Sequence, residues 1–257
     1  MHVTVNDKIA IVTGATRGIG LATARMLLES GAAGVTITSR RIENVESALE
    51  ELAEAGFGPD RVLGLAARAD DDTEAENAVA GTVERFGRID ILVNNAGTNP
   101  SGGQIMDVDM GAIDKTWLVN QRAPLVWSRV AYHAGMKQHG GTIVNVASVG
   151  GLRPSPIIGA YNVSKAALIH LTHQLAFELA PKVRVNAVAP AVVKTKLSEM
   201  LWADEEAAAR THPLGRLGVP QDVAAAITFL ASDQASWLTG VVLPVDGGVS
   251  GASGTLA

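Results

Sequence analysis

Three side chains near the middle of the chain have the types and the spacing needed for acid-base chemistry. Tyr161 and Lys165 are four residues apart, so both project from the same face of a helix and can reach the same ligand. Ser148 precedes Tyr161 by thirteen residues. A free tyrosine has a pKa near 10, and lowering it to about 7 takes roughly 4 kcal/mol of preferential stabilisation of the phenolate. We expect the Lys165 ammonium to provide this stabilisation and the Ser148 hydroxyl to polarise a substrate oxygen.

The spacing of tyrosine and lysine is weak support by itself, because many helices carry it for structural reasons, but a glycine-rich turn at residues 14–20 strengthens it. The turn follows an expected strand and opens an expected helix. Glycines at such a corner let the backbone approach a pyrophosphate, whose charge the helix N-terminus favours. A turn without a ligand is the alternative, but the strand and helix pattern around it favours a bound dinucleotide. The residues expected to contact the dinucleotide are Gly14, Thr16, Arg17, Gly18, Ile19 and Gly20.

The second expected strand ends in Ser39-Arg40-Arg41, which bears on the kind of dinucleotide. Sites that prefer NAD place an acid at this point, against the ribose 2′-hydroxyl. An acid would repel a phosphate, whereas Arg40 can make a forked contact to the 2′-phosphate of NADP. Arg17 is expected close by, Ser39 can donate its hydroxyl, and Arg41 adds charge. Solvated surface arginines are the alternative, but the pattern predicts an NADP(H) site.

The elements that must position these residues follow from hydrophobic periodicity. Short apolar runs alternate with longer segments whose apolar residues recur at three and four, which is typical of stacked βαβ units. The expected strands are 8–13, 34–40, 61–67, 90–94, 142–147, 183–189 and 241–245. The expected helices are 18–30, 42–55, 72–86, 110–138, 160–179 and 219–231. The sequence predicts an α/β fold in one domain, residues 1–257: a Rossmann fold with a doubly wound, seven-stranded parallel sheet and helices on both faces.

Composition narrows the classes of partner. The net charge is −5 and no run of lysine and arginine occurs, so nucleic acid and anionic lipid are not expected partners. No apolar stretch reaches the roughly 18 residues of a membrane span. The absence of cysteine excludes disulfides and thiolate ligands, and His170 and His173 lack an apparent third ligand, so no metal is expected. We expect a cytoplasmic protein that binds small molecules, with a flexible tail at residues 249–257.

These residues, with several others, resemble the short-chain dehydrogenase/reductases of the classical type. The resemblance extends over nearly the whole chain. Its motifs are Thr13-Gly14-x3-Gly18-x-Gly20, Asn94-Asn95-Ala96-Gly97, Asn120, Ser148, Tyr161-x3-Lys165 and Asp246-Gly247-Gly248. It implies direct hydride transfer between NADP(H) and a carbonyl or alcohol carbon, without a metal. Members of the family are commonly homotetramers packed through long helices, here those that begin near Met110 and Ala160.

The resemblance also implies a role for each matching residue. Tyr161 resembles the proton donor, and Ser148 resembles the ligand of the substrate oxygen. Lys165 resembles the ribose ligand that lowers the tyrosine pKa, helped by the oxidised nicotinamide. Asn120 resembles the residue that holds a water molecule in the proton relay. The remaining cofactor positions correspond to Asn94, Ala96 and Gly97 beside the adenosine ribose, to Val193 and Thr195 near the carboxamide, and to Pro190.

Two residues depart from the family pattern, and one segment bears on the substrate. Ala191 stands where the family usually has glycine, which leaves the path of that loop open. Arg68 replaces an acid that often touches adenine. Residues 191–217 correspond to the substrate lid of the family. Its apolar residues favour an apolar ketone or aldehyde, although an ordinary core stripe is the alternative. These residues are Leu197, Met200, Leu201 and Trp202.

Within the family, the chain most resembles the NADPH-dependent carbonyl and retinal reductases of the peroxisomal type. The 3-oxoacyl-carrier-protein reductases are the alternative, because residues 215–220 and 246–248 also resemble that group. A non-catalytic dinucleotide sensor is a third interpretation. The four intact catalytic positions argue against it.

Overall fold

Seven parallel strands form the centre of the molecule in the computed structural model, which describes residues 3–251. Their order across the sheet is β3-β2-β1-β4-β5-β6-β7. The strands are β1 Ile9–Val12, β2 Gly34–Ser39, β3 Val62–Ala66, β4 Ile91–Asn94, β5 Gly141–Val146, β6 Val183–Pro190 and β7 Val242–Val245. All seven predicted strands are confirmed, with ends that differ by at most one residue. The central strands are buried throughout, because helices cover both of their faces.

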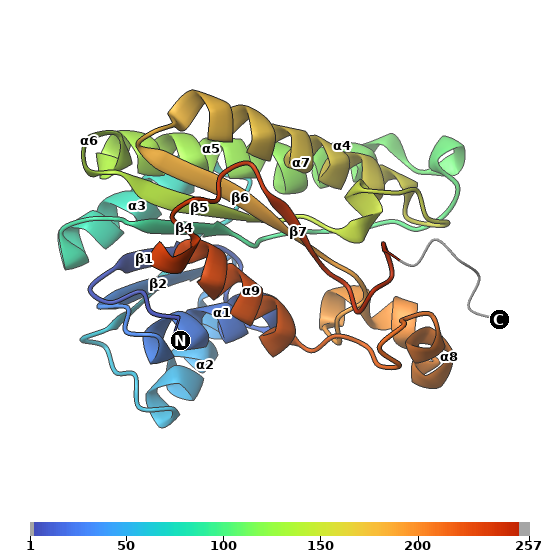
Figure 1. Cartoon of the computed structure of the whole chain (residues 1–257), viewed down its shortest axis with the longest axis horizontal. Helices are drawn as coiled ribbons and strands as arrows, with labels where there is room; N and C mark the ends of the chain where they lie inside the picture. Colours follow the sequence, from blue (N-terminus) through green and yellow to red (C-terminus); the bar gives the residue numbers. More distant parts are fainter. Residues whose placement is uncertain (1–2, 252–257) are drawn as a thin grey trace.

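One face of the sheet is covered by α1 Gly18–Glu29, α2 Ile42–Glu54 and α9 Pro220–Ala231 (Figure 1). Their buried side chains join the strands in one apolar core, to which each helix contributes. Examples are Leu27, Leu52 and Ile227. Because α1 packs against α9, the first and last helices of the fold lie together. Burial of each large aliphatic side chain contributes roughly 2 kcal/mol, so this core holds the start of α1 firmly at the sheet edge.

The opposite face is covered by α3 Asp72–Phe86, α5 Ala123–Ala131 and α7 Gly159–Leu179 (Figure 1). Trp127 of α5 is almost fully buried between sheet and helices, and its Nε1 donates to the carbonyl oxygen of Ala69 at 3.1 Å. Two shorter helices, α4 Met110–Trp117 and α6 Lys137–His139, extend the layer. Helix α7, which carries the tyrosine and the lysine, packs along β6.

The single long helix predicted over residues 110–138 is wrong in one respect. Two π-helical segments, Leu118–Arg122 and Tyr132–Met136, separate α4 from α5 and α5 from α6. A π turn holds one extra residue in a helical turn. One extra residue changes the hydrophobic pattern of a helix this long very little. The sequence therefore did not indicate the two π-helical segments.

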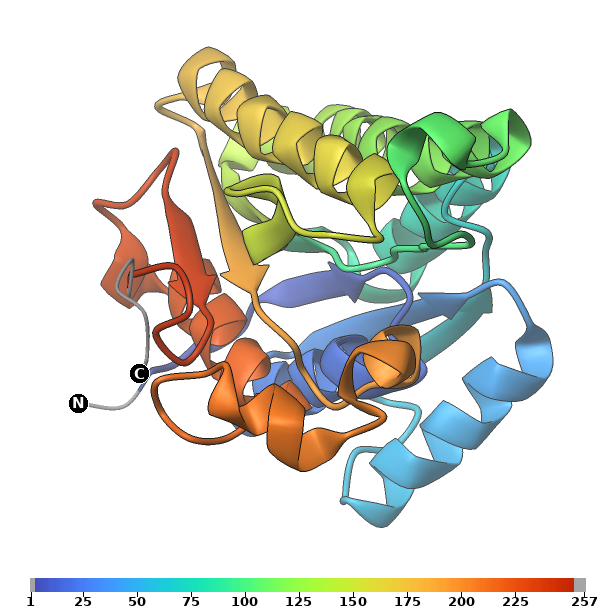
Figure 2. The same ribbon diagram turned by 90° about the vertical axis from the view of Figure 1, so that its right-hand side faces the viewer.

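The carboxyl ends of the strands meet at one edge of the sheet. Connections leave β1 toward β2 on one side and reach β4 on the other, and parallel sheets bind ligands where the order switches in this way. Between β6 and α9, a 3₁₀ helix at Lys196–Trp202 and helix α8, Glu205–Arg210, lie beside this edge (Figure 2). Neither helix was predicted. Further 3₁₀ helices are Ile105–Asp107, Val149–Gly151 and Asp233–Ala235.

Two further predictions concern the tail of the chain and the absence of a membrane span. Most of the predicted flexible tail, residues 249–257, lies outside the described residues. Within residues 3–251, none of the helices combines the length and the apolar character that crossing a bilayer would require.

Candidate active site

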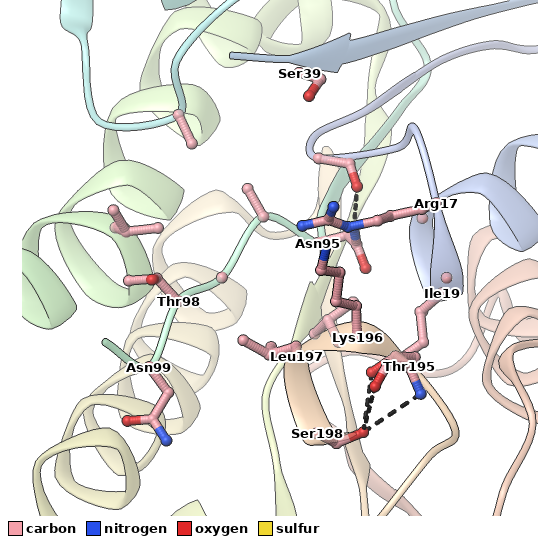
Figure 3. Close-up of a pocket in the computed structure, with 18 of the residues that line it drawn as sticks. Arg17, Ile19, Ser39, Asn95, Thr98, Asn99, Thr195, Lys196, Leu197 and Ser198 are labelled. Atoms are coloured by element: carbon pink, nitrogen blue, oxygen red, sulfur yellow. Dashed lines mark hydrogen bonds between the residues drawn. The ribbon is translucent and has the colours of Figure 1, made fainter. Parts of the chain in front are cut away.

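A cavity of about 1360 Å³ opens at the carboxyl edge of the sheet (Figure 3). The loops after β1, β2, β3, β4, β5 and β6 line it, together with the segment that contains the 3₁₀ helix Lys196–Trp202. Pockets for a single small ligand are usually about 300–1000 Å³, so this cavity has room for a dinucleotide and a substrate together. The predicted site residues all line the cavity except Asn94 and Asn120.

The glycine turn forms one wall of the cavity at the start of α1. Gly14 has a φ of +62°, and a Cβ on it would lie 2.9 Å from the Cα of Ala96. A Cβ on Gly20 would lie 2.6 Å from the carbonyl oxygen of Gly14. The N-cap residue Arg17 makes no side-chain hydrogen bond to the helix start, and the first turn carries no acid. The N–H groups at this helix end are therefore left for an anion.

Asn95, which lies in the predicted motif Asn94-Asn95-Ala96-Gly97 but had no predicted role, holds two loops together beside this turn. Its Nδ2 donates to the carbonyl oxygen of Thr13 at 2.9 Å. It also donates to the carbonyl oxygen of Gly14 at 3.0 Å (Figure 3). Asn94, which was predicted to line the cofactor site, is instead buried in the core. Its Nδ2 donates to Oδ1 of Asn145 at 2.8 Å. The expectation for Asn94 is corrected, because the last residue of β4 points into the core and the following residue faces the cavity.

Three arginines line the end of the cavity near β2, and they are not compensated by the protein. Arg17 lies in the turn after β1, and Arg40 and Arg41 follow Ser39 at the end of β2. Within residues 3–251, none of the three guanidinium groups has a hydrogen-bond or ion-pair partner. Because unpaired cations at one site repel one another, this end of the cavity fits a ligand with several negative charges.

Arg68 and Lys115 line the same cavity but share a carboxylate. Asp70 forms an ion pair with Arg68 at 3.3 Å and another with Lys115. Partial burial alone would raise the pKa of Asp70, but the Lys115 ammonium and then Arg68 outweigh it, so the pKa lies below its ordinary value. The arginine that replaces the acid of the family is thus already partnered. It adds less free charge to the cavity than the arginines after β2.

The other end of the cavity brings together the three side chains with the predicted acid-base spacing. Nζ of Lys165 lies 5.6 Å from the centroid of the Tyr161 ring, one helical turn along α7. Ser148 follows β5, accepts a hydrogen bond from the backbone N–H of Gly150 at 3.1 Å, and acts on the Tyr161 phenol so as to lower its pKa. Lys165 is almost completely buried, and its Nζ donates to the carbonyl oxygen of Val146 at 2.7 Å. Backbone contacts therefore fix both neighbours of the phenol.

Burial dominates the ionisation of this cluster. It raises the pKa of Tyr161 to about 12, which the hydrogen bond with Ser148 only partly offsets. Burial also lowers the pKa of Lys165 to about 8. The expectation that Lys165 brings the tyrosine pKa toward neutrality is not met by the groups of the protein alone. The phenol is instead held in its neutral form, which is the form that donates a proton.

Asn120 lies in the first π-helical segment and is completely buried. Its Nδ2 donates to the carbonyl oxygen of Thr98 at 2.9 Å and to Oγ of Ser164 at 3.0 Å, and its Oδ1 accepts from the N–H of Thr98 at 2.8 Å. These bonds tie the loop after β4 to α7. A Cβ on Gly97 would lie 3.6 Å from both Oδ1 of Asn120 and Nζ of Lys165. Asn120 thus holds the loop after β4 in place beside α7. Its role in a proton relay stays a prediction.

The end of β6 resolves the question that Ala191 raised. Pro190 closes the strand, and Val193 and Thr195 line the cavity after it. The N–H of Ala191 donates to the carbonyl oxygen of Val245 at 3.3 Å, and Ala191 is not among the residues with a positive φ. Alanine therefore fits this loop without backbone strain.

The apolar residues predicted for the lid separate into two groups. Leu197 and Met200 line the cavity, whereas Leu201 and Trp202 do not. The indole N–H of Trp202 donates to Oγ of Ser198 at 3.2 Å, within the 3₁₀ helix. Two of the four residues are therefore in a position to contact a ligand.

Comparison with known proteins agrees with this geometry. A family model described as enoyl-(acyl carrier protein) reductase matches residues 14–250. The dehydrogenase/reductase SDR family member 4 of Homo sapiens is 42% identical over 246 residues, which cover 94% of this chain and 87% of that protein. The chain belongs to the short-chain dehydrogenase/reductase family. The family predicted from the motifs is confirmed.

Two further comparisons extend over the whole fold. Tropinone reductase-like 3 of Erythroxylum coca is 39% identical over 244 residues, with 94% of this chain and 92% of that protein covered. The crystal structure of gox2181 has a TM-score of 0.91 at 33% identity and covers 96% of this chain and 97% of its own. Short-chain dehydrogenase/reductases use a nicotinamide dinucleotide and act on CH–OH and C=O groups. The chain is an oxidoreductase of this class.

Proposed function

We propose that the protein is an NADP(H)-dependent carbonyl reductase that acts on apolar ketones or aldehydes and, in reverse, on the corresponding alcohols. The observation that carries the proposal is the pair of uncompensated arginines, Arg40 and Arg41, at the end of β2 in the cavity that also holds Tyr161. Free cations at this point favour a 2′-phosphate over a bare hydroxyl, because a guanidinium binds phosphate through charge-assisted hydrogen bonds.

The cavity wall fits a phosphorylated dinucleotide along its length. The glycine turn leaves no room for side chains, and the start of α1 offers unfilled N–H groups, which suits a diphosphate. Arg40 and Ser39 would hold the 2′-phosphate, with Arg17 adding charge. Lys165 would bind the nicotinamide ribose. The other wall residues in this proposal are Thr16, Ile19, Arg41, Ala96, Gly97, Pro190, Val193 and Thr195.

The acid-base cluster supports reduction of a carbonyl. The dinucleotide supplies the hydride. As the carbonyl carbon gains a C–H bond, Tyr161 transfers its hydroxyl proton to the carbonyl oxygen, and an alcohol results. The Ser148 hydroxyl donates a hydrogen bond to the same oxygen, and the Lys165 ammonium stabilises the phenolate left behind. Burial supports this direction, because it raises the pKa of Tyr161 and keeps the phenol protonated.

An apolar substrate is proposed from the wall beside this cluster. Leu197 and Met200 line the cavity, and a Cβ on Gly102 would lie 4.0 Å from Cε of Met200. The lid, residues 191–217, thus comes close to the loop after β4 at this point, with an apolar side chain facing it. We propose that this segment covers the substrate within the single domain.

The test of cofactor preference is the substitution Arg40→Met. We expect it to weaken NADPH binding by at least about tenfold and NADH binding by less than about threefold, since only NADPH carries the 2′-phosphate. Dissociation constants for both cofactors are measured by calorimetry. Arg25→Met is the matched control, because Arg25 is on α1, is paired with Glu29 at 2.8 Å and does not line the cavity. Equal losses for both cofactors would refute the NADP preference.

A 3-oxoacyl-carrier-protein reductase is the second proposal. Residues 215–220 and 246–248 resemble that group, and the description of the matching family model names an acyl carrier protein, although for the reduction of an enoyl group. A panel of diketones, aldehydes and acetoacetyl thioesters separates the two. Preference for thioesters favours the second proposal. Binding of NADPH without turnover of any member favours a non-catalytic sensor.

We also propose a homotetramer that packs through the layer of α4, α5 and α7. Exposed apolar side chains on α7 support it, including Val163 at 54% and Phe177 at 84% exposure. Light scattering of the purified protein tests the assembly. A cytoplasmic location stays a prediction, which fractionation of expressing cells tests.

A further inference from the structure

Two lysines of the lid, Lys194 and Lys196, lie two residues apart but have different surroundings. Lys194 forms an ion pair with Glu205 of α8. Within residues 3–251, the ammonium of Lys196 has no hydrogen-bond or ion-pair partner. Both residues line the cavity. The lid therefore carries one compensated and one uncompensated cation.

The backbone places Lys196 next to the start of α1. A Cβ on Gly18, the first residue of that helix, would lie 3.2 Å from Cγ2 of Thr195. Lys196 is the next residue and begins the 3₁₀ helix of the lid. Its side chain extends from the lid into the cavity, across from Arg17 (Figure 3). Lys196 and Arg17 thus approach the uncapped end of α1 from two walls.

The charges around this point are strongly unbalanced. Eight lysine and arginine residues line the cavity, but Asp70 is the single acid among the lining residues described, and it is already paired with Arg68 and Lys115. Two free cations that extend into a shared space repel each other unless an anion lies between them. A helix N-terminus at the same place adds further positive potential. The ligand that fits is a phosphate group that contacts α1, Arg17 and Lys196 together.

We propose that Lys196 is a cofactor-binding residue that contacts the diphosphate of the dinucleotide from the lid, and that cofactor binding thereby fixes the lid. The inference rests on the proposed occupation of the cavity by a dinucleotide. It does not depend on the 2′-phosphate, because the diphosphate is common to NADPH and NADH. Lys196 and Arg40 therefore have separable effects on the two cofactors.

The first experiment measures dissociation constants of NADPH and NADH for wild type, Lys196→Met and Lys196→Arg. Methionine keeps most of the apolar stem but removes the charge. We expect Lys196→Met to weaken both cofactors by about tenfold and to make NADPH binding less sensitive to salt. Lys196→Arg should stay within about threefold of wild type. Lys194→Met is the matched control, and we expect less than a twofold effect because the charge of Lys194 is met by Glu205.

The second experiment follows the lid directly. Chymotrypsin can cleave after Leu197, Leu201 and Trp202 in the lid. We expect NADPH to protect these bonds in wild type and Lys194→Met, and to protect them several-fold less in Lys196→Met at saturating cofactor. Equal protection in all three proteins would overturn the coupling of cofactor and lid.

The outcomes distinguish this inference from the proposed function. If Lys196→Met binds both cofactors as wild type does, the inference fails while the Arg40 result still decides the NADP preference. A loss confined to NADPH would move Lys196 to the 2′-phosphate and overturn its assignment to the diphosphate. A raised KM for ketones that carry a carboxylate, with unchanged cofactor affinity, would assign Lys196 to substrate and also overturn it. Failure of wild type to bind either cofactor would refute both proposals.

Discussion

The two ends of the cavity differ in how the protein surrounds their charged and titratable side chains. At one end, Lys165 is held by a hydrogen bond to the backbone, Tyr161 is one helical turn away on α7, and burial shifts both pKa values strongly. At the other end, Arg17 and Arg40 have no partner within residues 3–251. Proton transfer needs groups whose position and ionisation are set beforehand. Phosphate binding needs charge that the protein has left uncompensated.

The largest effect that would test this comparison is expected from Tyr161→Phe. Loss of the proton donor should lower kcat by about a thousandfold, while the dissociation constant of NADPH changes by less than about threefold. The measurement is the loss of NADPH absorbance with a reducible ketone. Tyr132→Phe is the matched control, since Tyr132 is the other tyrosine of the chain and does not line the cavity. Turnover by Tyr161→Phe at the wild-type rate would exclude the phenol as the acid.

The next effect is on stability and concerns the buried lysine. Its folded pKa is about 8, below its ordinary value of 10.5, so the unfolded chain binds more protons between these two values. Stability should therefore rise with pH across this window, as the buried ammonium becomes neutral. From pH 7 to pH 10, we expect wild type to gain on the order of 2 kcal/mol relative to Lys165→Met. Urea unfolding of the cofactor-free proteins measures the difference, and a constant difference would argue against a buried charged lysine.

The smallest effect is expected from Arg68→Met, which sharpens the contrast at the phosphate end. Arg68 and Arg40 both line the cavity, but Arg68 is paired with Asp70. We expect Arg68→Met to weaken NADPH binding by less than about threefold, well below the effect of Arg40→Met. The reason is that Asp70 already compensates the charge of Arg68. The dissociation constants of the two variants give the comparison directly. A loss as large as that of Arg40→Met would mean that pairing does not decide which arginines bind phosphate.

Much of the fold could be predicted from the sequence because parallel strands covered on both faces are apolar throughout. Each of the seven runs became a strand, from β1 at Ile9–Val12 to β7 at Val242–Val245. The convergence of Tyr161, Lys165 and Ser148 could be predicted as well, since helical spacing and the end of a strand fix their directions. The glycine turn was predictable because its glycines stand between an apolar strand and an expected helix.

Other features depend on contacts between distant segments, which a sequence pattern does not contain. Asn94 and Asn95 are identical in type, and both faces of β4 are buried, so the pattern offered no means of deciding which one faces the cavity. The different surroundings of Lys194 and Lys196 depend on where Glu205 of α8 comes to lie. The low pKa of Lys165 depends on burial that only the packed layers create.

The π turn at Leu118–Arg122 allows the continuous helix of α4 and α5 to pack against different neighbours along its length. One additional residue advances all later side chains by roughly 100° about the helix axis. Before the turn, α4 packs against α7; after it, α5 packs against α3 and β4. The side chains that face the neighbouring elements therefore change direction in one step, and the helical chain continues without a break. Deleting one residue there would restore regular winding and turn either α4 or α5 by roughly 100° away from its present partner.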